Sequence, residues 1–363
     1  MSKDDGPSPG EPGDRMRERG TTSRVKLDVY LRADRRAVAL APLVVIFVSV
    51  VAFGLLDPTG LPTAVESSDP VETLGQGLLT SIVTGVTLVV SINQLVLSRE
   101  LGPLGDQRDR MQGSIAFRED VADLLDVPVA PPEPSAFMRA LAESIAARSR
   151  AVAETLPDNA GADADADSDD HSPADESTAR VREFATDVAE NADEVAGRLE
   201  GRQFGSFEVL SAALDLNYSW KIYQATRLRR THDGLSTETK AALDDLRDAL
   251  ELFGPAREHV KTLYFRWELV DLSRAMFYTA IPALVASIGA ILFLDNLGSV
   301  PGATLGISNL LLVVALVTAV SLSPFAVLAA YVLRILTVAK RTLSIGPFVL
   351  RSETRDENLD WES

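Results

Sequence analysis

The sequence predicts an all-α membrane protein with four transmembrane helices, arranged as two pairs, and a helical cytoplasmic insert between helices 2 and 3. Three observations predict this class. Four long stretches are apolar and contain no Lys, Arg, Asp, Glu or His. The basic residues that flank these stretches all fall on one side of the predicted membrane. The polar segment between the two pairs has helical periodicity and no alternating strand pattern.

The four apolar stretches are the predicted membrane spans. Each reaches the length of about 20 residues that a helix needs to cross the hydrocarbon core. A helix at the surface of a soluble core has a charged face, whereas these stretches are apolar all round, so burial in a large soluble core is the weaker alternative. The spans are Ala37–Leu56, Leu74–Leu97, Ala275–Leu294 and Ser308–Leu333.

The charges around the spans predict their orientation. Lys and Arg residues precede the first and third spans and follow the second and fourth, whereas the loops 57–73 and 295–307 contain none. Because basic flanks stay on the cytoplasmic side, we expect both termini and the middle segment inside and the two short loops outside. The protein is therefore predicted to be a multi-pass protein of the cell membrane, with the lipid bilayer as its first partner.

The chain is expected to have five parts. They are a cytoplasmic N-terminal tail, disordered at its start, over 1–36; helices 1 and 2 over 37–97; a cytoplasmic helical domain over 98–274; helices 3 and 4 over 275–333; and a cytoplasmic C-terminal tail over 334–363. Within the insert, Pro157–Ser177 is rich in Asp and almost lacks large apolar residues. Such a segment buries too little surface to offset its ordering entropy, so we expect a disordered acidic linker at 157–177.

Apolar periodicity predicts the helices of the insert. They cover Asp106–Asp126, Ser135–Leu156, Thr178–Leu199, Phe207–Thr231 and Thr237–Phe253. Ser236 is expected to cap the last of these, and Gly254-Pro255 to end it. A further helix from Ala256 is expected to run directly into the third span. We also expect kinks at Pro42, Pro282 and Pro324.

The charge balance is strongly negative, with 35 Lys+Arg against 52 Asp+Glu and a formal net charge of −17. An Asp-rich, Lys-poor composition without Cys is typical of salt-accumulating halophilic archaea, because at 1 M salt the Debye length is about 3 Å and self-repulsion is screened. An ordinary acidic protein is the alternative. The stretch Ser91–Gly102 (SINQLVLSRELG) resembles uncharacterised four-span integral membrane proteins of these archaea. That resemblance implies membrane location and no assigned activity.

The second span carries the most informative pattern. Hydroxyl and amide side chains fall within one narrow stripe of the helix: Thr80, Thr84, Thr87, Ser91 and Gln94. Small residues form a small-xxx-small series on the neighbouring face: Gly77, Ser81 and Gly85. The opposite side, with Ile82, Val86 and Val89, is expected to face lipid. Asn93 interrupts that side, and Asn93 and Gln94 are the side chains that need a hydrogen-bond partner.

This pattern has two interpretations. In the first, the small series lets another helix approach closely, while the hydroxyls bond across the interface or to their own i−4 carbonyls. In the second, the stripe lines a hydrated path formed by several copies of the chain. Because no span contains an ionisable side chain, the sequence disfavours proton relays and voltage sensors.

Most catalytic and cofactor-binding classes lack their motifs. The chain has no Cys, its three His are far apart, and it contains no zinc, phosphate-loop or nucleophile-elbow motif. The acidic run Asp163–Asp170 lacks the glycine and the terminal Glu of a calcium loop. We therefore expect no catalytic residues, no metal and no cofactor. The negative net charge also argues against a nucleic-acid partner.

Two clusters outside the spans have weaker interpretations. Arg227, Arg229 and Arg230 lie close in sequence to Tyr218 and Trp220, and this group either docks on an anionic partner or stabilises a helix C-terminus. Tyr264, Arg266 and Trp267 are expected to anchor the third span at the membrane interface.

These observations favour a non-enzymatic, oligomerising scaffold or regulator, which forms a homo-oligomer and whose cytoplasmic helical domain contacts a protein partner. The alternative is an oligomeric ion channel lined by the Thr/Ser stripe of the second span. Two helix pairs separated by a helical insert are similar in layout to bestrophin-like channels, and the layout alone supports this alternative. A membrane enzyme is the third class, and no acid/base pair supports it.

Overall fold

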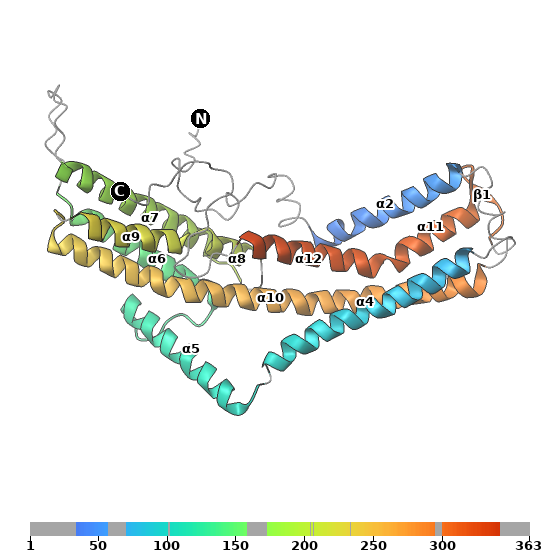
Figure 1. Cartoon of the computed structure of the whole chain (residues 1–363), viewed down its shortest axis with the longest axis horizontal. Helices are drawn as coiled ribbons and strands as arrows, with labels where there is room; N and C mark the ends of the chain where they lie inside the picture. The colour runs from blue at the N-terminus through green and yellow to red at the C-terminus, as the bar shows by residue number, and fades with distance from the viewer. Residues whose placement is uncertain are drawn as a thin grey trace, which may run out of the picture. The chain divides into compact units, whose positions relative to one another are not determined.

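The computed structural model describes residues 34–56, 70–100, 102–157, 173–203, 205, 207–232, 234–294 and 300–341 (Figure 1). The tail before residue 34, the loop residues 57–69, the linker residues 158–172 and the tail after residue 341 lie outside the described residues, as do the predictions made for them. The chain divides into two compact units. We call Leu104–Tyr264 the bundle unit, and we call Ser23–Pro103 together with Phe265–Val338 the apolar unit.

The apolar unit contains the predicted spans. Three helices are long and apolar enough to cross a membrane, namely α2 (Arg35–Leu56), α4 (Pro70–Glu100) and α10 (Thr237–Phe293), whose first part belongs to the bundle unit. A fourth candidate is the bent pair formed by α11 (Asn309–Ser321) and α12 (Ser323–Arg341). The described residues therefore confirm three or four candidate spans at the predicted places.

The fourth predicted span is broken rather than continuous. The axes of α11 and α12 differ by 42° at a break between Ser321 and Ser323. Pro324 lies in the first turn of α12, where its ring removes a backbone donor, so the predicted kink at this proline is confirmed. Pro42 and Pro282 lie inside α2 and α10, and neither interrupts its helix.

The buried face of α4 differs from the prediction. Ile82 and Val89, which were expected to face lipid, are buried against other helices. Ile82 packs on Ala280 and Ala283 of α10. Val89 belongs to a cluster with residues of α10 and α12. The buried positions 71, 75, 78, 82, 85 and 89 alternate spacings of four and three residues, which is the pattern of a helix packing seam.

The bundle unit is helical in all its described regular elements. These are α5 (Leu104–Leu125), α6 (Pro134–Glu154), α7 (Pro173–Leu199), α8 (Phe207–Leu214), α9 (Tyr218–Thr231) and the first part of α10. Buried alanines and β-branched residues bring α6 and α7 close together, and the Ser149 hydroxyl donates across this contact to the Ala185 carbonyl at 2.7 Å. The helix α7 begins at Pro173, so the last five residues of the predicted linker are helical.

The predicted helix Phe207–Thr231 is two helices, α8 and α9, separated at Asp215–Asn217. Two side chains of α7 satisfy the groups that this break exposes. The Asn191 amide donates to the Asp215 carbonyl at 3.1 Å, and Arg198 pairs with the Asp215 carboxylate at 2.5 Å. The break is therefore a tertiary effect.

The predicted break at Gly254-Pro255 is wrong, because α10 continues through it. A side chain at residue 254 would meet the Tyr218 ring, since a Cβ there would lie 2.7 Å from Tyr218 Cε2. Gly254 is thus a site of close packing. The predicted cap is confirmed, with the Thr239 amide donating to the Ser236 hydroxyl at 3.0 Å.

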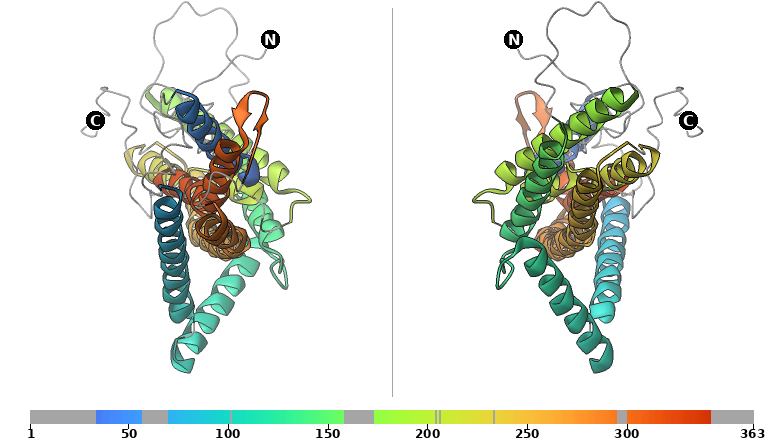
Figure 2. Two further views of the ribbon diagram at one scale, coloured as in Figure 1. Left: turned by 90° about the vertical axis from the view of Figure 1, so that its right-hand side faces the viewer. Right: turned by 90° about the vertical axis from the view of Figure 1, so that its left-hand side faces the viewer.

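A short antiparallel hairpin was not predicted. Strand β1 (Ala303–Thr304) pairs with β2 (Ile307–Ser308), and Figure 2 shows the two as paired arrows. Leu305 and Gly306 between them both have positive φ angles, 53° and 81°, as a tight two-residue hairpin turn requires.

Candidate functional site

The polar stripe of α4 faces away from the rest of the apolar unit. Its five members are exposed in the single chain: Thr80, Thr84, Thr87, Ser91 and Gln94. Three of their hydroxyls donate to carbonyls one turn earlier, Thr84 to Thr80 and Thr87 to Val83 at 2.8 Å, and Ser91 to Thr87 at 2.9 Å. Each of these hydroxyls uses its hydrogen within the helix and turns only acceptor lone pairs outward.

The predicted small-residue series is divided between two faces. Gly77 and Ser81 are exposed, whereas Gly85 is buried, and a Cβ there would lie 3.1 Å from Phe325 Cε1. The second close approach occurs at Gly75, where a Cβ would lie 2.7 Å from Ile291 Cγ1. Among the described residues, α4 therefore approaches its neighbouring helices closely at Gly75 and Gly85. Gly75 was not among the small residues that the sequence predicted to pack.

Asn93 has the partner that its position demanded. Its side-chain amide donates to the Ser273 hydroxyl of α10, and Ser273 donates in turn to the Leu269 carbonyl at 2.7 Å. Asn93 therefore belongs to the buried face of α4.

A cluster of charged and aromatic residues joins α2, α10 and α12. Arg35 Nη2 lies 2.5 Å from Glu268 Oε1, and Arg35 Nη1 lies 3.6 Å from Asp271 Oδ2. The same guanidinium donates to the Tyr331 hydroxyl at 3.4 Å and lies 4.9 Å from the centre of that ring. We call these four residues the Arg35 cluster.

The Arg35 cluster contains a deeply buried carboxylate. The Glu268 side chain is 1% exposed, and its Oε2 has no hydrogen-bond partner among the described residues. Arg35 is 26% exposed and supplies the balancing charge. Arg35 is one of the basic residues that precede the first span, and its partners could not be predicted because they lie 233 and 296 residues away along the chain.

A second polar contact lies at the bend between α11 and α12. The hydroxyls of Ser287 and Ser321 are 2.8 Å apart, and both residues are fully buried. The hydroxyl of Ser321 also donates to the Ala283 carbonyl at 3.5 Å.

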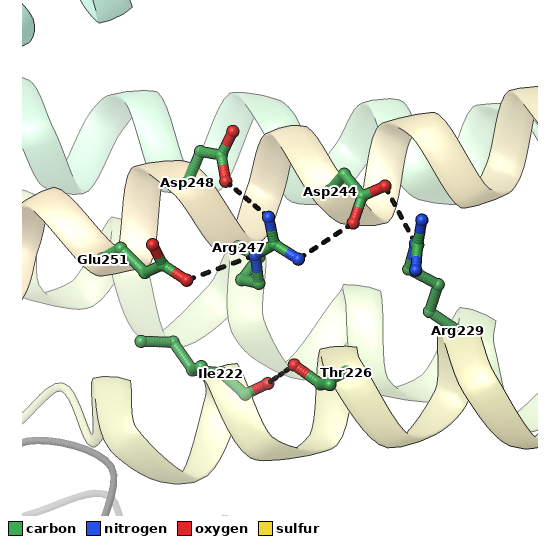
Figure 3. Close-up of polar contacts among 7 residues, drawn as sticks. All are labelled: Ile222, Thr226, Arg229, Asp244, Arg247, Asp248 and Glu251. Atoms are coloured by element: carbon green, nitrogen blue, oxygen red, sulfur yellow. Dashed lines mark hydrogen bonds and ion pairs between the residues drawn. The ribbon is translucent and has the colours of Figure 1, made fainter.

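One arginine of the α9 cluster, Arg229, forms an ion pair within the bundle unit (Figure 3). Arg229 Nε lies 2.8 Å from Asp244 Oδ2 of α10, and Arg247 contacts Asp244, Asp248 and Glu251 at 3.0 to 3.2 Å. The hydrogen bond that Arg247 donates to the Asp248 carboxylate is the largest of the effects that raise the pKa of Arg247 above its usual range. Arg229 sits in the last turn of α9, as the helix C-terminus interpretation expected.

The aromatic residues of the two weaker clusters are mainly structural. Trp220 is buried and stacks on Tyr223, with ring centres 5.4 Å apart. Tyr264 is also buried and packs on Phe207 at 6.0 Å, so its predicted role as an interfacial anchor is wrong. Trp267 is exposed and remains suited to that role.

In the part of the chain that the structure describes, no group of three or more His, Cys, Asp or Glu is placed to hold a metal ion. His171 and the acidic run 163–170 lie outside that part.

The elements and contacts described above define the class as a helical protein with several long apolar helices and a separate helical bundle. The whole chain, residues 1–363, matches a family described as "Family of unknown function (DUF7972)", and the chain belongs to this family. No curated protein and no solved structure matches it.

Proposed function

We propose that this protein is a multi-pass membrane scaffold that assembles with further copies of itself through the outward face of α4. The observation that supports the proposal is the orientation of α4, whose hydroxyl stripe is exposed while Ile82 and Val89 are buried. Lipid and apolar side chains attract a helix about equally, so association in a bilayer depends on close packing and interhelical polar contacts. Small and hydroxyl residues suit a second helix better than they suit lipid.

In this proposal both termini and the bundle unit lie in the cytoplasm, and the scaffold presents that bundle to a protein partner. The basic flanks and the charge-free spans support this topology. Because the chain has no Cys, single cysteines report their side without background. A cysteine at Ser67 should react with an impermeant maleimide from outside intact cells, and one at Glu190 only after lysis. The reverse pattern would refute the topology.

Cysteine crosslinking tests the oligomer. Thr84→Cys lies within the stripe, and its matched control Ile92→Cys is exposed on the same helix, about 80° around the axis from Thr84 and farther from the other stripe residues. We expect a dimer band from Thr84→Cys and a much weaker one from Ile92→Cys. Equal crosslinking at the two positions, or a single-chain mass in mild detergent at every concentration, would refute assembly through the stripe.

A channel is the second candidate, and the back-bonded hydroxyls favour it. Their outward lone pairs form a line of acceptors, which suits a hydrated cation path between several copies. Flux of potassium into proteoliposomes at high salt separates the two functions. A channel requires flux that the double variant Thr84→Leu/Thr87→Leu abolishes and that Val83→Leu, an exposed control, leaves intact. Crosslinked oligomers without flux would support the scaffold alone.

A further inference from the structure

The first half of α5 extends away from the rest of the bundle unit. All thirteen residues from Leu104 to Ala116 are exposed. The second half is packed, with Val121 and Ala122 buried and the Phe117 ring 6.1 Å from that of Phe137.

An uncovered helix of this length is marginal in water. Helix nucleation is unfavourable, so isolated segments shorter than about 12 to 15 residues are barely stable even with good helix formers. The exposed segment also contains Gly105 and Gly113, each of which costs about 1 kcal/mol relative to Ala in a helix. Neither glycine has a neighbouring atom that would meet a Cβ, so neither is required for packing within the chain.

The segment presents a narrow apolar stripe. Leu104, Met111 and Ile115 are 82%, 67% and 47% exposed, and their spacing of seven and four residues places them on one side of the helix. Arg108 lies within this stripe, and Glu119 borders it on one side. An apolar stripe that includes a charged residue is suited to a helix that offers the opposite charge.

The charges of the segment favour a second copy of the same helix as its occupant. Asp106, Arg108, Asp109 and Arg110 sum to zero in a chain of net charge −17, so two copies can approach here without the repulsion that acts elsewhere. A membrane surface fits less well, because binding there requires basic residues gathered on one polar face, and Arg108 and Arg110 lie on nearly opposite sides.

We propose that the first half of α5 forms an antiparallel two-fold interface with α5 of a second copy. Pairing about residues 113 and 114 brings Met111 and Ile115 of both copies together and sets each Arg108 against Glu119 of the other copy. Because the interface is two-fold, the ion pair between Arg108 of one copy and Glu119 of the other occurs twice. The inference rests on the proposed self-assembly. At most about 14 Å of extended chain connects the end of α4 to the start of α5. Copies that associate through α4 therefore keep their α5 helices close enough to pair.

The test uses the full chain in proteoliposomes with one cysteine per copy. Ile115→Cys lies near the two-fold axis on the stripe, and Gly113→Cys is its control on the opposite face of the same turn. We expect Ile115→Cys to form a disulfide dimer and Gly113→Cys to form little. Equal dimer from both positions would overturn the proposal, as would protection of Ile115→Cys from a soluble maleimide by lipid in a chain that stays monomeric.

A second experiment exchanges the charges at Arg108 and Glu119 to test the antiparallel register. In the Ile115→Cys background, Arg108→Glu or Glu119→Arg alone should lower the dimer yield about fivefold, because each creates two like-charge contacts. The double exchange should restore the yield, and failure to restore it would refute the antiparallel register. If Thr84→Cys crosslinks while Ile115→Cys does not, the α5 interface fails and the α4 assembly stands. If neither crosslinks, the proposed function itself fails.

Discussion

Removing the Arg35 guanidinium should destabilise the apolar unit more than removing the Glu268 carboxylate. Arg35→Met leaves an unbalanced charge on a side chain that is 1% exposed, a change that costs about 3 to 5 kcal/mol. Glu268→Gln leaves Arg35 26% exposed and still 3.6 Å from Asp271, so we expect about 1 to 2 kcal/mol. The double variant Arg35→Met/Glu268→Leu removes both charges and should lie within about 1 kcal/mol of the wild type.

The assay is unfolding of the full chain in detergent at constant high salt, followed by circular dichroism. Arg139→Met is the matched control, because Arg139 forms an ion pair with Glu143 at 2.7 Å on the exposed surface of the bundle unit. Such pairs contribute little, so this variant should show no measurable loss. The reasoning would be refuted if Arg35→Met were as mild as Arg139→Met, or if Glu268→Gln were the more costly of the two single changes.

Three further predictions concern close packing and salt. Gly75→Val forces a methyl group into α10 and should cost about 1 to 3 kcal/mol in detergent unfolding, whereas Gly289→Val, where a Cβ meets no neighbouring atom, should leave unfolding unchanged. Gly254→Ala should cost a similar amount because it meets the Tyr218 ring, while Gly197→Ala should stabilise the chain by up to about 1 kcal/mol. Lowering KCl from molar to dilute should reduce helicity by circular dichroism, since the charge of −17 is no longer screened; full helicity at low salt would contradict this.

The long apolar helices could be predicted because their signal is local. Twenty uncharged residues in a row exclude most soluble arrangements wherever the segment lies in the fold. The cap at Ser236 and the kink at Pro324 are local for the same reason, since each depends on the hydrogen bonds of one helical turn.

The orientation of α4 could not be predicted, because both of its faces are uncharged. Hydrophobicity does not separate lipid from the side of another helix, so the choice depends on fit between surfaces. That fit consists of Gly75 against Ile291 and Gly85 against Phe325, which are far apart in the chain. The hydroxyls of the stripe could turn outward because their own carbonyls already satisfy them.

Local rules failed in the bundle unit wherever packing supplied a stronger contact. Gly254-Pro255 is a strong breaker by propensity, yet the Tyr218 ring occupies the space above Gly254 and α10 continues. The opposite happened at Asp215, where no breaker was visible and Asn191 and Arg198 of α7 stabilise a break. In these places tertiary contacts outweigh helix propensities, which in a helix interior disfavour Gly by about 1 kcal/mol and Pro by about 3 kcal/mol relative to Ala.

Two polar contacts of the apolar unit lie on one short stretch of α10. Glu268 binds Arg35 of α2 on one side, and Ser273 accepts the Asn93 amide of α4 on another. Arg35 also donates a hydrogen bond to the hydroxyl of Tyr331 in α12. Within five residues, therefore, α10 is joined by hydrogen bonds or ion pairs to α2 and α4, and through Arg35 to α12. Hydrogen bonds in a low-dielectric environment are costly to break, so these contacts resist displacement of α2 and α4 relative to α10.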